Sequence, residues 1–190
     1  MVDVDSYLEC NCSVARQYVT IDDVRIINAL ITEPSVIEDK LPENYRERLE
    51  GMIQAVSTRS SRYSDDHETD AFGLSQFETL ENFFETEFHY ICDDRSDILY
   101  LSAMLMYRIT GGHPFEEGNK RTAYLSACLM LSQHHMHNEL EEAVIPKLDE
   151  NLLNALEDIA SEDESYEAED LEQVYRKPMK EELEKLLNSD

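Results

Sequence analysis

The segment Gly111–Arg121, with the sequence GGHPFEEGNKR, combines a titratable base, carboxylates, an amide and two cations in one short stretch. His113 could take a proton from an attacking hydroxyl, because imidazole is the side chain whose unperturbed pKa lies closest to neutral pH. Glu117 offers a hard oxygen ligand for a Mg²⁺ ion that also bridges phosphate oxygens. Lys120 and Arg121 could offset the charge on phosphates in a transition state. These residue types predict chemistry on a phosphate-bearing substrate.

The flanking sequence predicts a helix-loop-helix elbow around this segment. Residues Ile98–Ile109 are apolar enough for a buried helix, and the two glycines that follow predict its end, since glycine readily takes the left-handed conformation. Residues Arg121–Leu131 predict a second, largely buried helix. Its free backbone N–H groups would point back at the loop, where Gly118 allows close approach and Asn119 adds a donor. Such a helix start is suited to hold an anion such as a phosphate.

The letters HPFEEGNKR resemble the signature of the Fic/Doc (Fido) family, HPFx(D/E)GN(G/K)R. The resemblance implies an all-α, Fic-like helical bundle in which His113 is the general base and Glu117 holds Mg²⁺. The phosphate-binding residues that it implies are Gly118, Asn119, Lys120 and Arg121. It also implies ATP or another nucleoside triphosphate as co-substrate, and a hydroxyl side chain of a target protein as the acceptor.

Two positions are similar to the Doc (death-on-curing) branch. Lys120 stands where AMP-transferring members commonly have Gly, and Tyr124 stands where they carry a second Arg. Resemblance to this branch implies a toxin of a toxin-antitoxin pair, which moves the terminal phosphate onto a protein of the translation machinery. Because neither end matches the inhibitory pattern (S/T)xxxE(G/N), we expect inhibition from a separate antitoxin protein. Two alternatives stay open: Fic-type AMP transfer, and a non-catalytic module that only binds nucleotide.

A flap over the site is a further implication of the resemblance. The stretch Ser57–Asp70 is too polar to be buried and predicts a surface loop. Next to it, at Phe72, Gly73 and Leu74, we expect a short β-hairpin that docks the target segment by strand addition. Pro114 and Phe115 are expected to be structural, as a stiffener of the loop entry and an anchor in the core.

Amphipathic patterns predict the remaining helices. Thr20-x-x-Asp23 resembles a capping box that opens a helix, and Ser75-x-x-Glu78 resembles another. The helix after Thr20 has an apolar face of Ile21, Val24, Ile27 and Ile31, and the helix after Ser75 has one of Phe77, Leu80, Phe84 and Phe88. Further helices are expected after Pro42 and after Pro146. Their apolar faces are, for the first, Tyr45, Leu49, Met52, Ile53 and Val56, and for the second, Leu148, Leu152, Leu153, Leu156 and Ile159.

We expect one main domain with two additions. These are an N-terminal extension at 1–19, a Fic/Doc-like helical domain at 20–160, and an acidic helical tail at 161–190 that is broken near Pro178. Leu183, Leu186 and Leu187 of the tail could dock on the core or meet a partner.

The charge is strongly negative, with 42 acidic and 16 basic residues and a formal net charge of -26. A field of that sign repels nucleic acid and anionic membranes, so we expect neither as a partner. The acidic residues are spread along the chain, which predicts a solvated surface of the kind found in halophilic proteins; an acidic face for a basic partner is the alternative. The chain has no apolar run of about 20 residues and no basic-then-apolar leader, which predicts a cytoplasmic protein.

Cysteine and histidine clusters add no metal site to these expectations. Cys10, Cys12, Cys92 and Cys128 have no disulfide-framework spacing, so free thiols are predicted, with Cys128 in the core. The group His134, His135 and His137 lies where an apolar helix gives way to polar sequence, and a solvated helix end is expected there.

Overall fold

The computed structural model describes residues 3–32, 74–140, 143–161 and 166–188. These residues form helices, and an isolated bridge between Glu9 and Asp97 is the only strand-like pairing among them. In chain order the elements are α1 (Val4–Leu8), α2 (Cys12–Ala15), α3 (Ile21–Thr32), α6 (Leu74–Asn82), the π-helical segment η1 (Phe83–Glu87), α7 (Phe88–Asp94), α8 (Ile98–Gly112), α9 (Asn119–His137), α10 (Glu150–Ala160) and α11 (Ala168–Leu187). The all-α prediction is confirmed, whereas the helix expected after Pro42 lies outside the described residues.

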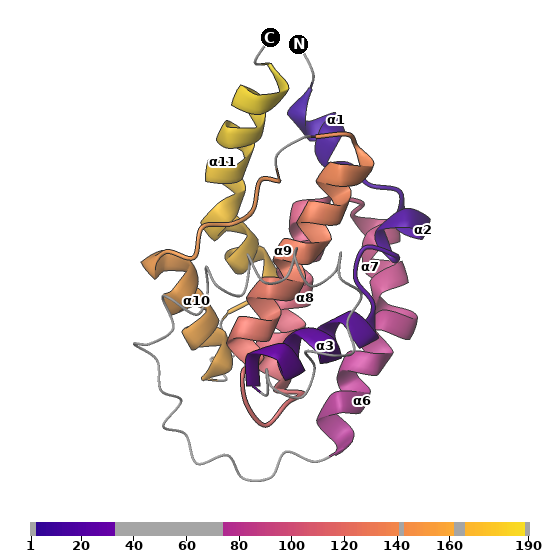
Figure 1. Cartoon of the computed structure of the whole chain (residues 1–190), viewed down its shortest axis with the longest axis vertical. Coiled ribbons are helices and arrows are strands. Elements are labelled where there is room, and N and C mark those ends of the chain that lie inside the picture. Colours follow the sequence, from indigo (N-terminus) through magenta and orange to yellow (C-terminus); the bar gives the residue numbers. More distant parts are fainter. Residues whose placement is uncertain (1–2, 33–73, 141–142, 162–165, 189–190) are drawn as a thin grey trace.

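The helices α8 and α9 form the centre of the molecule, with the other helices packed around them (Figure 1). Asp97 starts α8, because its carboxylate accepts hydrogen bonds from the backbone N–H groups of Leu99 and Tyr100. Both helices are apolar on most of their faces, as expected for helices buried on several sides. Their fully buried residues include Leu99, Leu101, Leu105, Met106 and Ile109 of α8, and Ala127, Cys128, Met130 and Leu131 of α9. The buried position predicted for Cys128 is confirmed.

The helix α3 packs against α9, and its start follows the predicted capping box. The Thr20 backbone N–H donates to the Asp23 carboxylate at 2.8 Å, and the Asp23 N–H donates back to the Thr20 hydroxyl at 3.3 Å. Val24 and Ile27 are fully buried in the core, while Ile31 is partly buried. This placement brings the C-terminal half of α3 onto the start of α9.

The helical run from α6 through α7 differs in detail from the amphipathic pattern. Ser75 is already inside α6, so it does not precede that helix as the predicted capping box requires. Leu80 and Phe88 are buried as predicted, but between them Phe83 is fully buried and Phe84 only partly so. The π-helical turn of η1 explains the difference, because one wider turn shifts which side chain faces the core.

The C-terminal helices cover α8. Leu152, Leu156 and Ile159 of α10 are buried as predicted, and Leu183 of α11 docks on the core. The predicted break near Pro178 is wrong, since α11 runs without interruption from Ala168 to Leu187. Pro178 itself is exposed on α11, and its missing N–H removes one hydrogen bond from the helix. Buried Tyr175, Met179 and Leu183 hold the helix to the core on both sides of the proline.

The N-terminal segment packs against the C-terminal end of α9 and explains why its histidines are buried. The prediction of a solvated helix end is wrong for His134 and His135, which are 1% and 0% exposed. His134 Nε2 donates to the Tyr7 carbonyl at 2.9 Å, and His135 Nε2 donates to the Val144 carbonyl at 2.9 Å. The Tyr7 hydroxyl lies 2.7 Å from His135 Nδ1. Segments distant in sequence thus satisfy both rings.

A disulfide joins Cys12 of α2 to Cys92 of α7, so the prediction of free thiols is wrong for this pair. The two residues are separated by 80 positions, and no local spacing pattern would indicate the bond. Cys10 and Cys128 are free thiols as predicted.

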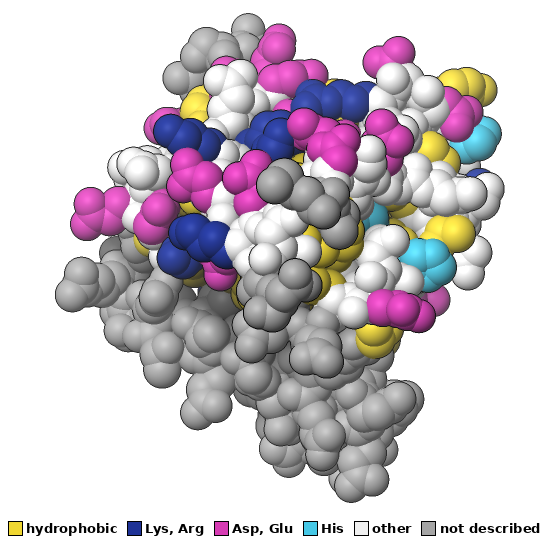
Figure 2. All heavy atoms as spheres, turned by 90° about the horizontal axis from the view of Figure 1, so that it is seen from above, with side chains coloured by type: hydrophobic (Ala, Val, Ile, Leu, Met, Phe, Trp, Pro, Cys, Tyr) yellow, Lys and Arg dark blue, Asp and Glu magenta, His cyan; other side chains and the backbone are white. Residues whose placement is uncertain are grey.

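The end of the molecule that carries α1 and the C-terminal part of α11 has mixed charge. Figure 2 shows Lys and Arg side chains among Asp and Glu side chains on this end. Buried Glu172 binds Arg95 at 2.7 Å and Arg176 at 3.0 Å, and Arg176 also binds Asp97 at the start of α8. This network ties α11 to α8.

No helix among the described ranges has the length and apolarity needed to cross a membrane.

Candidate functional site

The loop between α8 and α9 begins with a left-handed histidine. The helix α8 continues through Gly111 and Gly112, and His113 takes the left-handed conformation with φ 42° and ψ 52°. The prediction that a glycine takes this conformation is therefore wrong. Gly111 instead allows α8 and α10 to pack closely, because a Cβ there would lie 3.4 Å from the Ile159 side chain of α10. A non-glycine residue in this conformation costs roughly 1 kcal/mol, which the surrounding contacts must offset.

One ring nitrogen of His113 is held by the end of α10. Nε2 lies 3.1 Å from the backbone carbonyl of Ala160. A carbonyl only accepts hydrogen bonds, so Nε2 carries a proton in this contact, and the lone pair of the neutral ring is on Nδ1. This contact helps to orient the ring of the predicted base and favours the tautomer with the proton on Nε2.

Asn119 closes the loop through its side chain. Its Oδ1 accepts from the Phe115 N–H at 3.0 Å, and its Nδ2 donates to the Phe115 carbonyl at 2.7 Å. Phe115 packs partly buried against the core, as predicted for an anchor. Since the Asn119 side chain is engaged inside the loop and 8% exposed, its direct contribution to an anion would come from its backbone N–H.

The other side of the loop rests on α3. Asn28 Nδ2 donates to the Glu117 carbonyl at 2.8 Å and to the Thr122 hydroxyl at 3.0 Å. Gly118 has a positive φ of 77°, and a Cβ at this position would lie 3.2 Å from Asn28 Nδ2 and 3.3 Å from the Thr32 methyl group. Gly118 is thus required both by its backbone conformation and by the close approach of α3.

The start of α9 has the features of an anion site. Gly118 is the N-cap and supplies no side-chain cap, so backbone N–H groups of the first turn are not satisfied by a cap side chain. Lys120 and Arg121 lie in that same turn and are partly exposed, while the side chains of Glu116 and Glu117 are exposed on the preceding loop. The positive potential of the helix start and two cations therefore lie in one turn, with two carboxylates on the loop just before it.

Tyr124 lies one turn further along α9 and points into the protein. It is 7% exposed, and its hydroxyl donates to the Pro146 carbonyl at 2.8 Å. The side chain at this position therefore belongs to the core and not to the charged loop.

The donor set fits a nucleotide-bound Mg²⁺ ion, which needs few protein ligands. No group of three or more His, Cys, Asp or Glu side chains among the described residues could enclose a metal ion. Mg²⁺ in nucleotide sites is commonly held by one or two carboxylates together with substrate phosphates. Glu117, exposed beside the start of α9, meets that requirement.

The predicted flap lies mostly outside the described residues. Leu74 is the first residue of α6 and is helical, so the hairpin does not include it as a strand residue. Phe72 and Gly73 are not among the residues that the structure describes.

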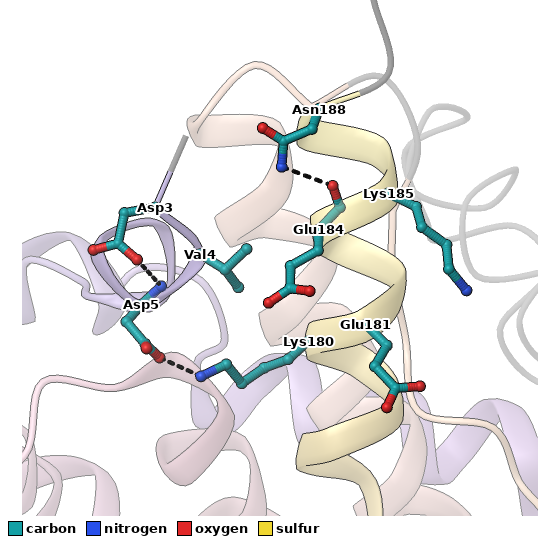
Figure 3. Close-up of a pocket in the computed structure, with 8 residues that line it drawn as sticks. All are labelled: Asp3, Val4, Asp5, Lys180, Glu181, Glu184, Lys185 and Asn188. Carbon is teal, nitrogen blue, oxygen red and sulfur yellow. Dashed lines mark hydrogen bonds and ion pairs between the residues drawn. The ribbon is translucent and has the colours of Figure 1, made fainter. Parts of the chain in front are cut away.

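An open groove lies far from this loop, between α1 and the C-terminal half of α11 (Figure 3). It is lined by Asp3, Val4, Asp5, Lys180, Glu181, Glu184, Lys185 and Asn188. Figure 3 shows Lys180 reaching across to Asp5, with which it forms an ion pair. Because carboxylates outnumber ammonium groups along this groove, it is poorly suited to a nucleotide, and the loop at the start of α9 is the better candidate.

Sequence reasoning missed two partners of the site, Asn28 and Ala160. Asn28 had a weak signal, because it lies one turn after Val24 and one turn before Ile31, on the border of the apolar face of α3. A polar residue at such a place often has a specific partner. Ala160 had no signal, since it acts through a backbone carbonyl.

The model of the Fic/DOC family matches residues 18–131, which is more than half of the chain and includes α3, α8 and most of α9. No curated protein and no solved structure matches the chain significantly. Members of this family are generally transferases that modify proteins with part of a nucleotide. The family match covers the whole charged loop together with the helices that hold it, and on this ground the chain belongs to the Fic/DOC family.

Proposed function

We propose that the chain transfers the terminal phosphate of a nucleoside triphosphate to a hydroxyl side chain of a target protein. In this proposal it acts as a Doc-like toxin in the cytoplasm, with a target in the translation machinery and an antitoxin protein as its inhibitor. The family match supports a protein-modifying transferase in general. The Doc-like reaction is the part that the proposal adds.

The proposed roles follow from the placement of the side chains. His113, oriented by the Ala160 carbonyl, takes the proton of the target hydroxyl. The hydroxyl oxygen then bonds to the terminal phosphorus, and the bond from that phosphorus to the bridging oxygen breaks, which releases a nucleoside diphosphate. Lys120, Arg121 and the N–H groups at the start of α9 stabilise charge on the phosphates. Mg²⁺ bound through Glu117 would neutralise part of the polyphosphate charge.

The observation that carries the phosphate-transfer proposal is the direction of Tyr124. In the Fic/DOC family, AMP-transferring members commonly carry a second Arg at this position. That Arg helps to hold the polyphosphate in the orientation that AMP transfer requires. Here the side chain is buried, and its hydroxyl binds the Pro146 carbonyl. In the part of the chain that the structure describes, Lys120 and Arg121 in the first turn of α9 supply cations next to the loop. This arrangement favours the Doc-like orientation over AMP transfer.

Mass spectrometry of candidate target proteins tests the proposal. Lysate proteins are incubated with the chain, Mg²⁺ and ATP at high salt, and His113→Ala serves as the control. We expect a phosphate-sized gain on a hydroxyl residue, reduced about 10²- to 10⁴-fold by His113→Ala, the range that general-base catalysis supplies. Nucleotide binding by His113→Ala should be retained, because the base acts on the other substrate.

The other outcomes separate the alternatives. An AMP-sized gain would replace phosphate transfer by Fic-type AMP transfer. Nucleotide-dependent stabilisation without any modified product would favour a module that only binds nucleotide. A His113→Ala variant that transfers at the wild-type rate would contradict the assigned base.

A further inference from the structure

The loop that carries the predicted catalytic groups is fixed at two points by amide side chains. Asn119 closes it from inside by pairing with both backbone groups of Phe115. Asn28 holds it from outside, and it comes from α3, far away in the sequence. Between these two points the exposed side chains of Glu116 and Glu117 project from the loop. The backbone at Glu117 is therefore set by a residue outside the recognised motif.

The Asn28 contact joins the loop to the helix that follows it. Its Nδ2 has two N–H donors, and the structure uses them on the Glu117 carbonyl at 2.8 Å and the Thr122 hydroxyl at 3.0 Å. Thr122 is fully buried, and its own N–H donates to the Gly118 carbonyl at 2.8 Å. The amide thus bridges the residue before Gly118 and the first turn of α9.

The Asn28 side chain is itself fixed by the packing of α3. A Cβ on Gly118 would lie 3.2 Å from Nδ2, so helix and loop are in direct contact at this point. The Asn28 carbonyl accepts a hydrogen bond from the Thr32 hydroxyl at 2.9 Å, and Thr32 also lines the contact with Gly118. Asn28 only donates in these contacts, so it holds the first turn of α9 through the Thr122 hydroxyl and leaves the backbone N–H groups at the start of the helix to a ligand.

We infer that Asn28 is a positioning residue of the transfer reaction, which fixes the Glu117 carboxylate relative to the start of α9. This inference rests on the proposed function, because it assigns Glu117 to Mg²⁺ and the start of α9 to phosphates. Asn28 touches no reacting atom and acts through the Glu117 backbone and Thr122. Its loss should weaken binding of the Mg²⁺-nucleotide while leaving the base, His113, in place on α8 and α10.

Two substitutions at Asn28 separate the lost donor from other effects. Asn28→Leu has a similar size but no donor, and Asn28→Asp keeps the shape but offers only acceptors. Asn154→Asp is the matched control, because Asn154 is exposed on α10 and receives the same change of charge. The probe is Mg²⁺ with a non-hydrolysable ATP analogue, with affinity measured by calorimetry and unfolding measured in parallel.

We expect both Asn28 variants to bind the probe about tenfold more weakly than wild type, the scale of one or two lost hydrogen bonds. The KM for nucleotide should rise more than kcat falls, and Asn154→Asp should match wild type. Wild-type affinity in both variants, with a lower unfolding midpoint alone, would overturn the inference and leave Asn28 as a packing residue. Wild-type protein that fails to bind the probe would instead overturn the proposed function.

Discussion

The two ends of α9 are built differently. At its start, two left-handed residues, His113 and Gly118, flank a loop held by amide side chains, and charged groups remain exposed. At its other end, His134 and His135 are buried and hydrogen-bonded to the N-terminal segment and to residue Val144. The end without an assigned reaction thus holds two titratable side chains buried and hydrogen-bonded, whereas the other end leaves its charged side chains accessible.

This difference shows where the fold obtains its rigidity. The Cys12–Cys92 disulfide and the ion network around Glu172 tie peripheral helices together away from the charged loop. A loop that binds a nucleotide must leave polar groups available to its ligand, and it can therefore contribute less to stability. The comparison predicts that changes at the C-terminal end of α9 alter stability, whereas changes at the start of α9 alter ligand binding.

The largest effect on stability is expected from the disulfide. Reduction of Cys12–Cys92 opens a covalent loop with a sequence separation of 80 residues. The chain-entropy model gives a loss of about 4.5 kcal/mol in the free energy of unfolding for a loop of this length. Urea unfolding of the oxidised and reduced protein measures the change, with Cys10→Ser as a control that keeps the bond. The affinity of the folded, reduced protein for Mg²⁺-nucleotide should stay the same.

A reduced protein that remains folded but loses nucleotide affinity would contradict the comparison. It would mean that the disulfide and the charged loop are coupled, through α7 and the helices between them.

The next largest effect is a loss of stability in acid, which we expect from buried His135 at the C-terminal end of α9. Burial lowers the pKa of His135 to about 4, and the neighbouring His134 adds to this shift while the Val144 carbonyl opposes it. The unfolded chain takes up this proton near pH 6.5, so below that pH the unfolded state binds more protons. The free energy of unfolding therefore falls between about pH 6.5 and pH 4, by about 3 kcal/mol in total for this group.

The substitution His135→Gln isolates that contribution. Glutamine can still donate to the Val144 carbonyl, but it does not titrate. Unfolding of both proteins at pH 8, where His135 is neutral in both states, measures the structural cost of the change. The difference between the proteins should then shrink as the pH falls toward 4. A constant difference across this range would show that His135 does not contribute to acid lability.

Local sequence patterns sufficed where the determining contacts are close along the chain. The Thr20–Asp23 capping box, the buried faces of α3 and α10, and the two apolar helices around the charged loop were all predicted. Each depends on residues within a few positions of one another, so helical periodicity and cap chemistry carry the information. The family motif placed the loop between those helices for the same reason.

Three of the wrong predictions concern features that distant segments decide. His134 and His135 are buried because Tyr7 packs on them, and Cys12 meets Cys92 because α2 lies against α7. The helix through Pro178 continues because its two sides are held on the core. In the site, the role of Asn28 depends on α3 crossing the loop.

The smallest effect on stability is expected for Gly118→Ala, which tests the charged loop at the start of α9. Alanine there would keep a positive φ near 77° and place a Cβ 3.2 Å from Asn28 Nδ2. The backbone conformation alone costs roughly 1 kcal/mol in stability. Relief of the close contact would also move the loop away from α3, so nucleotide affinity should fall as well.

Gly112→Ala is the matched control for this substitution. Gly112 is helical and has no positive φ, and a Cβ there would have open space around it among the described residues. Alanine at a helical position without steric conflict is stabilising by roughly 0.5–1 kcal/mol, so the two alanine variants should move stability in opposite directions. Calorimetric unfolding and titration with Mg²⁺-nucleotide measure both effects. Equal nucleotide affinity in the two variants would mean that the contact of α3 with Gly118 does not set the geometry of the loop, and that the start of α9 holds its ligand without support from α3.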